Sequence, residues 1–459
     1  MPISILRETC ARWLHILTGC LTSILRLIQA SDDTLALARI KAPKIIEMLE
    51  QDNFRALHSN LVPALCYILP ERLLREGFHM VRLGAGPIVN VGEPVISRGI
   101  FANVKVLVEF KRAKFTIGFR MTSAGKLLTL NLSPAQFLSS PNAWKPPAYV
   151  QSAVVKEVDV NLGAFGSRVS GVLTLPSSGG RYPCVIMLSG SGPCDKDSSV
   201  GALKPFKDLA LGLARFGVAS LRFDKVTYAH GLRIKLLQKK FTLTDEYVPH
   251  ALDALTKCLA HPNIMPDGVF VLGHSLGGLV ASRLATIDSR ITGCILLATP
   301  AQGVHQCLLR QLRYFADQDD PSDDSPKPIL DEIQRQVDLA DSPDLNLATP
   351  ASNLPMGIGP AYWLDMRNYD SVEDCHRLQK PILIIQGGRD YQVTIDDDYR
   401  RFVDILGGKS GVHMRVYDKC NHLFVAGEGR PSPNEYQTAG NVEKDVIRDI
   451  SRWITDSMT

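Results

Sequence analysis

The sequence predicts an α/β fold in which helices flank a mostly parallel sheet, preceded by a smaller α+β domain. From residue 152 onward, short continuous apolar runs alternate with helical segments, which is typical of strands buried on both faces of a sheet. Between residues 103 and 132, apolar and polar residues alternate one by one, which predicts antiparallel strands with one exposed face. The chain of 459 residues is long enough for both domains.

The composition narrows the functional classes. Hydrophobic residues make up 45% of the chain and charged residues 21%, as in globular proteins. The net charge of +4 comes without a dense Lys/Arg run, so we expect no nucleic-acid partner. The ten cysteines form neither a C-x-x-C pair nor a zinc-binding pattern, which predicts no metal site and reduced thiols in the cytoplasm. Because no stretch of 18 apolar residues occurs, we expect no transmembrane segment.

Residues 1–30 have apolar side chains at roughly helical spacing, which predicts an amphipathic N-terminal helix. Charged residues interrupt the apolar stretch that a signal peptide needs. The segment LTGC, residues 17–20, superficially fits a lipoprotein cleavage site, but the same charges argue against it. We expect this helix to pack on the body of the protein, with peripheral membrane attachment as the alternative.

Residues 31–138 form the predicted small α+β domain. The stretch 31–80 is expected to be helical with one break at Pro43, and strands are expected at 103–110, 113–120 and 126–132. Residues 139–151 are rich in proline and small polar residues, which predicts a semi-rigid linker. For the small domain the sequence leaves open a lid support, a substrate gate and a homodimer surface.

Residues 152–459 carry the α/β pattern. Strands are expected at 153–162, 168–176, 184–190, 218–224, 269–273, 292–299, 381–388 and 412–418. Helices are expected at 205–217, at 245–261 and directly after Ser275. The segment 302–380 contains helical patterns and an acidic, proline-punctuated loop, and we interpret it as a lid or cap insertion.

The motif GHSLGG, residues 273–278, stands between a predicted buried strand and a predicted helix. A G-x-S-x-G pattern alone is also compatible with a serine in a tight turn. The strand-turn-helix setting, however, is what a nucleophile elbow requires, because the glycines let the strand and the helix approach each other. We therefore predict that Ser275 is a nucleophile.

A serine nucleophile needs a histidine base and an acid that orients the base. In this type of fold both follow the serine along the chain, each just beyond a strand. Asp390 follows the apolar run PILIIQGG, and His422 follows the next predicted strand. The competing acids at 396–398 open a predicted helix, and we interpret them as N-terminal caps. Of the other histidines, His413 lies within a strand and His274 flanks the serine, where we expect it to be held in the elbow.

An oxyanion hole requires two backbone donors near the nucleophile. The first is predicted to be the N–H of Leu276, the residue after the serine. The second is predicted to be the N–H of Gly190 or Ser191, in the glycine-containing loop SGSGPCDKD that follows the strand CVIML.

With these residues placed, the chain from about residue 40 onward resembles a group of α/β-hydrolases of the dienelactone-hydrolase and serine-esterase type that carry a small N-terminal domain. The segments that resemble this group are WKPPAYV, SGSGPCDKD, PFKDLALGLARFGVASLRFDKVTY, GHSLGG, QGGRDYQVTIDDD and the C-terminal segment beginning CNHLFVAGEG. The resemblance implies an α/β-hydrolase fold and maps the family's serine, acid and histidine onto Ser275, Asp390 and His422. Two residues depart from the family pattern: Ser189 replaces a histidine and Val226 replaces an arginine.

Together these observations predict a serine hydrolase that cleaves small-molecule carboxylic esters or thioesters through an acyl-enzyme, without a cofactor. An acyltransferase or a cyclising release enzyme that uses the same acyl-serine is the first alternative. A non-catalytic ligand-binding protein that retains the pocket is the second.

Overall fold

The computed structural model describes residues 29–134, 144–150, 155–237, 239–318 and 326–458. Residues 1–28 of the predicted N-terminal helix and residues 139–143 and 151 of the predicted linker lie outside these ranges. Two compact units are distinguished, the first within residues 1–78 and 87–135 and the second within 79–86 and 136–459. Across the described ranges, we find no helix with the length and apolar character needed to cross a membrane.

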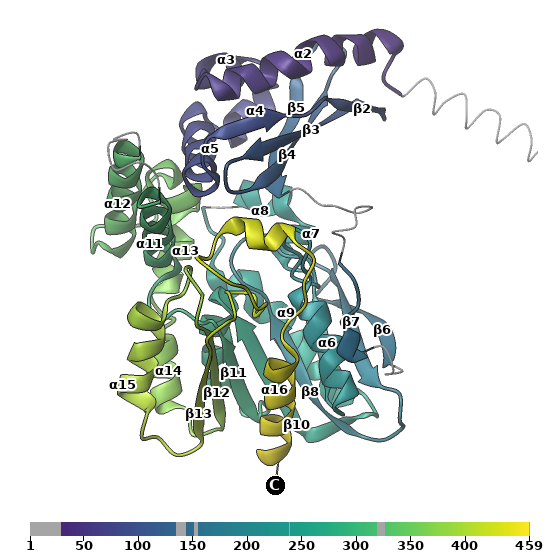
Figure 1. The fold of residues 1–459 in the computed structure, drawn as a ribbon, viewed down its shortest axis with the longest axis vertical. Helices are drawn as coiled ribbons and strands as arrows, with labels where there is room; N and C mark the ends of the chain where they lie inside the picture. The colour runs from purple at the N-terminus through teal and green to yellow at the C-terminus, as the bar shows by residue number, and fades with distance from the viewer. Residues whose placement is uncertain (1–28, 135–143, 151–154, 238, 319–325, 459) are drawn as a thin grey trace, which may run out of the picture. The chain divides into compact units, whose positions relative to one another are not determined.

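The first unit combines short helices with an antiparallel sheet (Figure 1). Its helices are α2 (Asp32–Glu50), α3 (Phe54–Ser59), α4 (Pro63–Ile68) and the beginning of α5 (Glu71–Ala85). Its strands are β1 (Ile88–Val91), β2 (Val95–Arg98), β3 (Ala102–Phe110), β4 (Lys114–Met121) and β5 (Leu127–Pro134). The strand order is β1-β3-β4-β5, and β2 also pairs with β3.

Alternating side chains build the core of this first unit. Every second residue of β3 is buried, including Val104, Val106 and Val108, as the period of two predicts. The expected break at Pro43 is wrong, because α2 continues through it from Asp32 to Glu50. Proline removes one backbone hydrogen bond. The buried face on both sides of Pro43 compensates for that loss, since Ala42, Ile45 and Ile46 are among its buried residues.

The second unit contains an eight-stranded sheet in the order β13-β12-β11-β10-β8-β9-β7-β6. Neighbouring strands from β13 through β12, β11, β10 and β8 to β9 run parallel, whereas β7 pairs antiparallel with both β9 and β6, which confirms the mostly parallel sheet. Their bounds are β6 Val155–Leu162, β7 Val169–Pro176, β8 Tyr182–Leu188, β9 Ala219–Phe223, β10 Ile264–His274, β11 Gly293–Leu297, β12 Ile382–Gly387 and β13 Val412–Tyr417.

Helices cover both faces of this sheet. The side chains of one strand alternate between the two faces, so Ile186 of β8 joins one hydrophobic cluster and Val185 joins the other. The face of Val185 packs on α6 (Pro205–Arg215) and α16 (Lys444–Asp456). The face of Ile186 packs on α9 (Leu243–Ala260), α10 (Leu276–Ile287), α14 (Ser371–Arg377) and α15 (Arg400–Leu406). The result is a three-layer α/β/α arrangement.

The segment between β11 and β12 is mostly helical, as the insertion at 302–380 predicts. It contains α11 (Val304–Ala316), α12 (Lys327–Asp341) and α13 (Pro360–Met366), and it ends with α14. The short helices α7 (Val226–Ala229) and α8 (Gly231–Leu237) form a second elaboration, between β9 and α9.

A buried arginine ties together the antiparallel end of the large sheet. Arg222 of β9 donates to Asp197 at 3.0 Å, to Glu157 at 2.8 Å and to Thr174 at 2.8 Å. Burial opposes ionisation of Asp197, but hydrogen bonds and charge from Lys204 and Arg222 outweigh it and hold the pKa of this carboxyl below its usual value.

We expect Arg222→Met to lower the free energy of unfolding by about 3 kcal/mol, because it leaves Asp197 buried beside a single, half-exposed lysine. The comparison variant is Arg290→Met, which breaks an ion pair whose arginine is 46% exposed. It should cost less than about 1 kcal/mol. Urea unfolding measures the free energy of unfolding of both variants. Equal losses in the two variants would contradict a stabilising role of Arg222 beside Asp197.

The stability contributed by Asp197 should also depend on pH. Since its pKa is lowered on folding, the folded state binds fewer protons than the unfolded chain near pH 4. The contribution is therefore complete above its ordinary pKa of 3.8 and is lost as the pH falls below that value. Urea unfolding of the wild type and Arg222→Met between pH 3 and pH 7 should show the difference in stability between them shrinking toward acid.

Candidate active site

The three residues predicted to act together follow neighbouring parallel strands. Ser275 directly follows β10, Asp390 comes three residues after β12, and His422 lies in the loop after β13. The order β13-β12-β11-β10 places the carboxyl ends of these strands along one edge of the sheet. All three residues are buried.

The backbone at Ser275 is held in a strained turn. Its φ of 53° and ψ of −126° are unusual for a residue with a side chain. The Ser275 N–H donates to the Leu297 carbonyl at 2.9 Å, and the Ser275 carbonyl accepts from the Gly278 N–H at 2.8 Å. These two bonds fix the serine between β11 and the first turn of α10.

The glycines around Ser275 are required by close backbone contacts. A Cβ on Gly273 would lie 2.1 Å from the Gly277 carbonyl oxygen, and a Cβ on Gly277 would lie 2.2 Å from the Leu188 carbonyl oxygen. A Cβ on Gly278 would meet the Thr299 hydroxyl at 1.9 Å. The glycine pattern of the motif therefore has a steric cause, and it brings α10 against the end of β8.

Asp390 and His422 form a buried hydrogen-bonded pair. His422 Nδ1 lies 2.7 Å from Asp390 Oδ2, which is also within 3.2 Å of the Gln386 amide. The other carboxylate oxygen accepts from the backbone N–H groups of Gln392 at 2.8 Å and Val393 at 3.0 Å. With Nδ1 engaged by the carboxylate, Nε2 is the ring nitrogen left for proton transfer.

His274 connects the serine turn to the histidine loop. Its Nε2 lies 2.9 Å from the His422 carbonyl oxygen, and the centroids of the two imidazole rings are 4.6 Å apart. Burial, reinforced by the neighbouring His422, lowers the pKa of His274 to about 3. A neutral His274 can donate this hydrogen bond, which agrees with the structural role expected for it. The described side chains show no hydrogen bond between the Ser275 hydroxyl and His422, so Ser275 is linked to the pair through its neighbour.

The competing acids lie in the first turn of a helical segment, as predicted, and one of them has a further role. Asp398 is fully buried and pairs with Arg310 of α11, while it accepts from the Ala301 N–H at 3.0 Å. The cap of this helical turn is Thr394, whose hydroxyl accepts from the Asp397 N–H at 3.1 Å. Asp398 accepts from the Thr394 N–H at 3.1 Å, so it takes part in the cap as predicted, and it also anchors the insertion through Arg310. His413 lies within β13, as predicted.

The loop predicted to supply an oxyanion donor lies beside the serine. A Cβ on Gly190 would stand 3.3 Å from Ser275 Cβ and 3.4 Å from His274 Nδ1. On its other side, the loop contacts a buried lysine that sequence reasoning did not select, because Lys225 Nζ donates to the Gly190 carbonyl at 2.9 Å. The only sequence signal for this lysine was its place beside Val226 in a segment that departs from the family pattern.

The insertion contacts the loop that carries Asp390. Tyr314 of α11 stacks on Tyr391 with the ring centroids 5.2 Å apart and the planes within 8° of parallel. Phe315 meets the same ring edge-on. The insertion also reaches α9, where the Tyr362 hydroxyl donates to Glu246 at 2.7 Å. These contacts place the insertion against the Asp390 loop and against α9.

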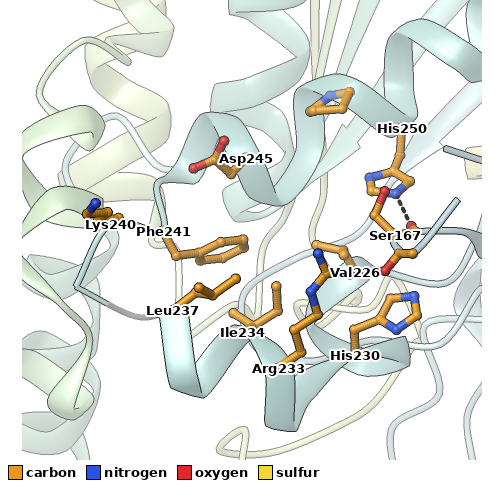
Figure 2. Close-up of a pocket in the computed structure, with 12 residues that line it drawn as sticks. Ser167, Val226, His230, Arg233, Ile234, Leu237, Lys240, Phe241, Asp245 and His250 are labelled. Carbon is orange, nitrogen blue, oxygen red and sulfur yellow. Dashed lines mark hydrogen bonds between the residues drawn. The ribbon is translucent and has the colours of Figure 1, made fainter. Parts of the chain in front are cut away.

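A separate pocket of about 340 Å³ lies between α7, α8 and the beginning of α9 (Figure 2). Its apolar lining comes from Val226, Ile234, Leu237, Phe241 and Pro249. Basic side chains also line it, namely His230, Arg233, Lys240 and His250. Figure 2 shows the hydrogen bond from His250 to the Ser167 carbonyl, at 2.8 Å, on one wall. The sequence did not predict this pocket.

No group of three or more His, Cys, Asp or Glu side chains with a metal-binding arrangement occurs in the described ranges. The side chains that the sheet edge brings together are a hydroxyl, an imidazole and a carboxylate.

The alpha/beta hydrolase family matches residues 169–432 of this chain. A curated relative, esterase EstD from Thermotoga maritima, is 30% identical over 348 residues, which cover 76% of this chain and 78% of the relative. The chain therefore belongs to the alpha/beta hydrolase family, and the resemblance seen in its sequence is confirmed.

Solved structures with similarity to this chain include two esterases. Est1E from Butyrivibrio proteoclasticus is 15% identical, with 65% of this chain and 98% of that chain covered and a TM-score of 0.43. The esterase domain of a Rhodothermus marinus protein is 15% identical, with 67% and 100% covered and a TM-score of 0.40.

We expect Gly277→Ala to destabilise the second unit by at least about 3 kcal/mol, since the new methyl group collides with backbone rather than with a movable side chain. Gly408→Ala is the control, because its Cβ meets nothing within 4 Å and its stability should change by less than about 1 kcal/mol. Thermal unfolding of the two variants measures the contrast. A fully stable Gly277→Ala protein would contradict the close approach of α10 and β8.

Proposed function

We propose that this protein is a serine hydrolase of carboxylic esters, with Ser275 as nucleophile, His422 as base and Asp390 as the acid that orients the base. The observation that carries the proposal is the 2.7 Å Asp390–His422 pair at the sheet edge where Ser275 occupies a strained turn. Strain at a single residue with a side chain is typical of functional sites. A relative named as an esterase supports an ester as the substrate.

In the proposed reaction the Ser275 Oγ attacks the ester carbonyl carbon while its proton passes to His422 Nε2. The carbonyl π electrons move to the oxygen, and the N–H groups of Leu276 and of Gly190 or Ser191 stabilise that oxyanion. Collapse of the intermediate breaks the ester C–O bond, and the imidazolium returns its proton to the leaving alkoxide. Water then attacks the acyl carbon while His422 takes its proton, the bond between that carbon and Ser275 Oγ breaks, and the imidazolium returns the proton to Oγ as the acid leaves.

Asp390 acts on the charge of the base in this scheme. When His422 becomes an imidazolium, the adjacent carboxylate stabilises the positive charge and keeps Nδ1 protonated. The two backbone donors and the Gln386 amide that surround Asp390 fix its orientation.

Thioester cleavage and acyl transfer use the same acyl-serine. The proposed triad therefore does not decide whether the leaving group is an alcohol or a thiol, or whether water or another molecule accepts the acyl group. The contacts of the insertion with the Asp390 loop favour a covered site, and a covered site limits the access of water. Product analysis with an added alcohol or amine distinguishes hydrolysis from acyl transfer. Predominant hydrolysis would support the proposed function, whereas predominant transfer to the added alcohol or amine would favour the acyltransferase alternative.

We place the protein in a reducing compartment, the cytoplasm. All eight described cysteines are free, and most of them are buried. This agrees with the cysteine spacing of the full sequence, which is not that of a disulfide framework.

A fluorophosphonate probe should label the wild type at Ser275, and Ser275→Ala should abolish labelling and lower kcat/KM for p-nitrophenyl esters by at least about 10⁴-fold. The matched control is Ser282→Ala, which removes another buried hydroxyl of α10. This control should label normally. A labelled Ser275→Ala protein, or an unlabelled but folded wild type, would overturn the proposal.

Asp390→Asn should keep the protein folded but lower kcat by about 10³- to 10⁴-fold, because the amide no longer stabilises the imidazolium and permits the wrong histidine tautomer. The comparison variant is Asp397→Asn, since this carboxylate is part of the competing acidic segment but is half-exposed. It should retain kcat within about threefold. Steady-state kinetics with a short p-nitrophenyl ester measures both, and similar losses would contradict the assignment of Asp390.

A further inference from the structure

A lysine is buried behind the loop that is predicted to bind the oxyanion. Lys225 is 2% exposed and lies at the end of β9. Its Nζ donates to the Gly190 carbonyl at 2.9 Å and to the Tyr247 hydroxyl at 2.8 Å, and it lies 3.0 Å from Glu246 Oε1. A buried ammonium is costly, so three partners at this distance indicate a specific role.

The hydroxyl of Tyr247 contacts the same stretch of backbone. It lies 2.8 Å from the Ser189 carbonyl oxygen and 2.9 Å from the Gly190 carbonyl oxygen. Two consecutive carbonyl groups of the loop are therefore turned toward Lys225 and Tyr247. No backbone carbonyl other than these two accepts a hydrogen bond from this pair of side chains in the described structure.

The orientation of the two carbonyls determines that of two N–H groups. In a trans peptide the C=O and the following N–H point in opposite directions. The N–H groups of Gly190 and Ser191 therefore point away from the buried cation. The Cα of Gly190 faces the serine, since a Cβ there would stand 3.3 Å from Ser275 Cβ.

We propose that Lys225 is a positioning residue that aims the Gly190 and Ser191 N–H groups at the substrate oxyanion and, through the carbonyls, strengthens them as donors. This inference rests on the proposed function of Ser275. A cation that binds a peptide carbonyl polarises that peptide, and its N–H becomes a better hydrogen-bond donor. Such help increases as negative charge develops in the transition state, so it raises kcat more than it tightens substrate binding.

Glu246 balances the charge of Lys225 and connects it to the insertion. One of its carboxylate oxygens accepts from Thr227 at 2.8 Å and the other from Tyr362 of α13 at 2.7 Å. Every oxygen of this buried carboxylate therefore has a partner. The chain of contacts Tyr362–Glu246–Lys225–Gly190 makes the position of the insertion one of the factors that hold the loop.

The test removes the charge of Lys225 without leaving Glu246 unpaired. Lys225→Met combined with Glu246→Gln keeps the volume of both side chains and leaves no net charge. The matched control is Arg283→Met with Asp374→Asn, which neutralises another ion pair, between α10 and α14. Tyr247→Phe is a smaller change that removes one hydroxyl and leaves the ion pair intact.

We expect the double variant to lose at least tenfold in kcat for p-nitrophenyl esters, with KM within about twofold, and to be labelled by the fluorophosphonate probe correspondingly more slowly. Tyr247→Phe should show a smaller loss of the same kind, and the Arg283 and Asp374 control should keep wild-type rates. Hydrogen–deuterium exchange should quicken in residues 189–196 of the double variant and stay unchanged in β10.

The outcomes separate the two proposals. If the wild type is labelled and the folded double variant matches it in kcat and labelling rate, the role of Lys225 is overturned and the proposed hydrolase stands. If the wild type is not labelled, the hydrolase proposal falls, and the catalytic part of this inference falls with it. A double variant that changes KM alone, or that changes exchange in β10 as much as in the loop, also overturns the inference, because a general loss of structure would explain it.

Discussion

The turn at Ser275 is the constraint on which the rest of this site depends. The chain must leave β10 and enter α10 within one residue, and it can do so because glycine backbones at 273 and 277 pass within contact distance of their neighbours. The same closeness brings α10 against the end of β8, whose loop supplies the predicted second oxyanion donor. One steric requirement therefore positions both the nucleophile and part of its electrostatic environment. The loops after β12 and β13 need only reach the same edge of the sheet, which parallel strand order ensures.

Most of the architecture could be predicted from the sequence because its strands are buried on both faces. Such strands have continuous apolar sequences, and this pattern predicted β8, β10, β11 and β12. The short strands β1 and β2 were not predicted, because their side chains are mostly exposed and their sequences show no strong hydrophobic pattern. Pro43 was misjudged because local propensity yields to the burial of the helix face around it.

The site was predictable to the extent that it follows local rules. Ser275, Asp390 and His422 each stand just after an apolar run, so position along the chain was sufficient to select them. Lys225 and Glu246 could not be found in this way, because their pairing depends on how α9 packs beside β8 and β9. The ion pair of Asp398 was missed for a similar reason: a run of acidic residues at a helix start predicts a cap, and only the fold shows that Arg310 also lies opposite Asp398.

The contacts of the insertion restrict how this enzyme family member can diversify. Arg310 neutralises Asp398 beside the loop of Asp390, and Tyr362 completes the partners of Glu246. Replacing α11 or α13 by an unrelated segment would leave a buried carboxylate without one of these partners. Neither helix can therefore be exchanged freely for another. Among the described side chains, neither α12 nor α8 supplies a partner to these two carboxylates, so variation in length and sequence is better tolerated there. Sequence differences among close homologues should therefore accumulate in those two helices, while α11 and α13 change slowly.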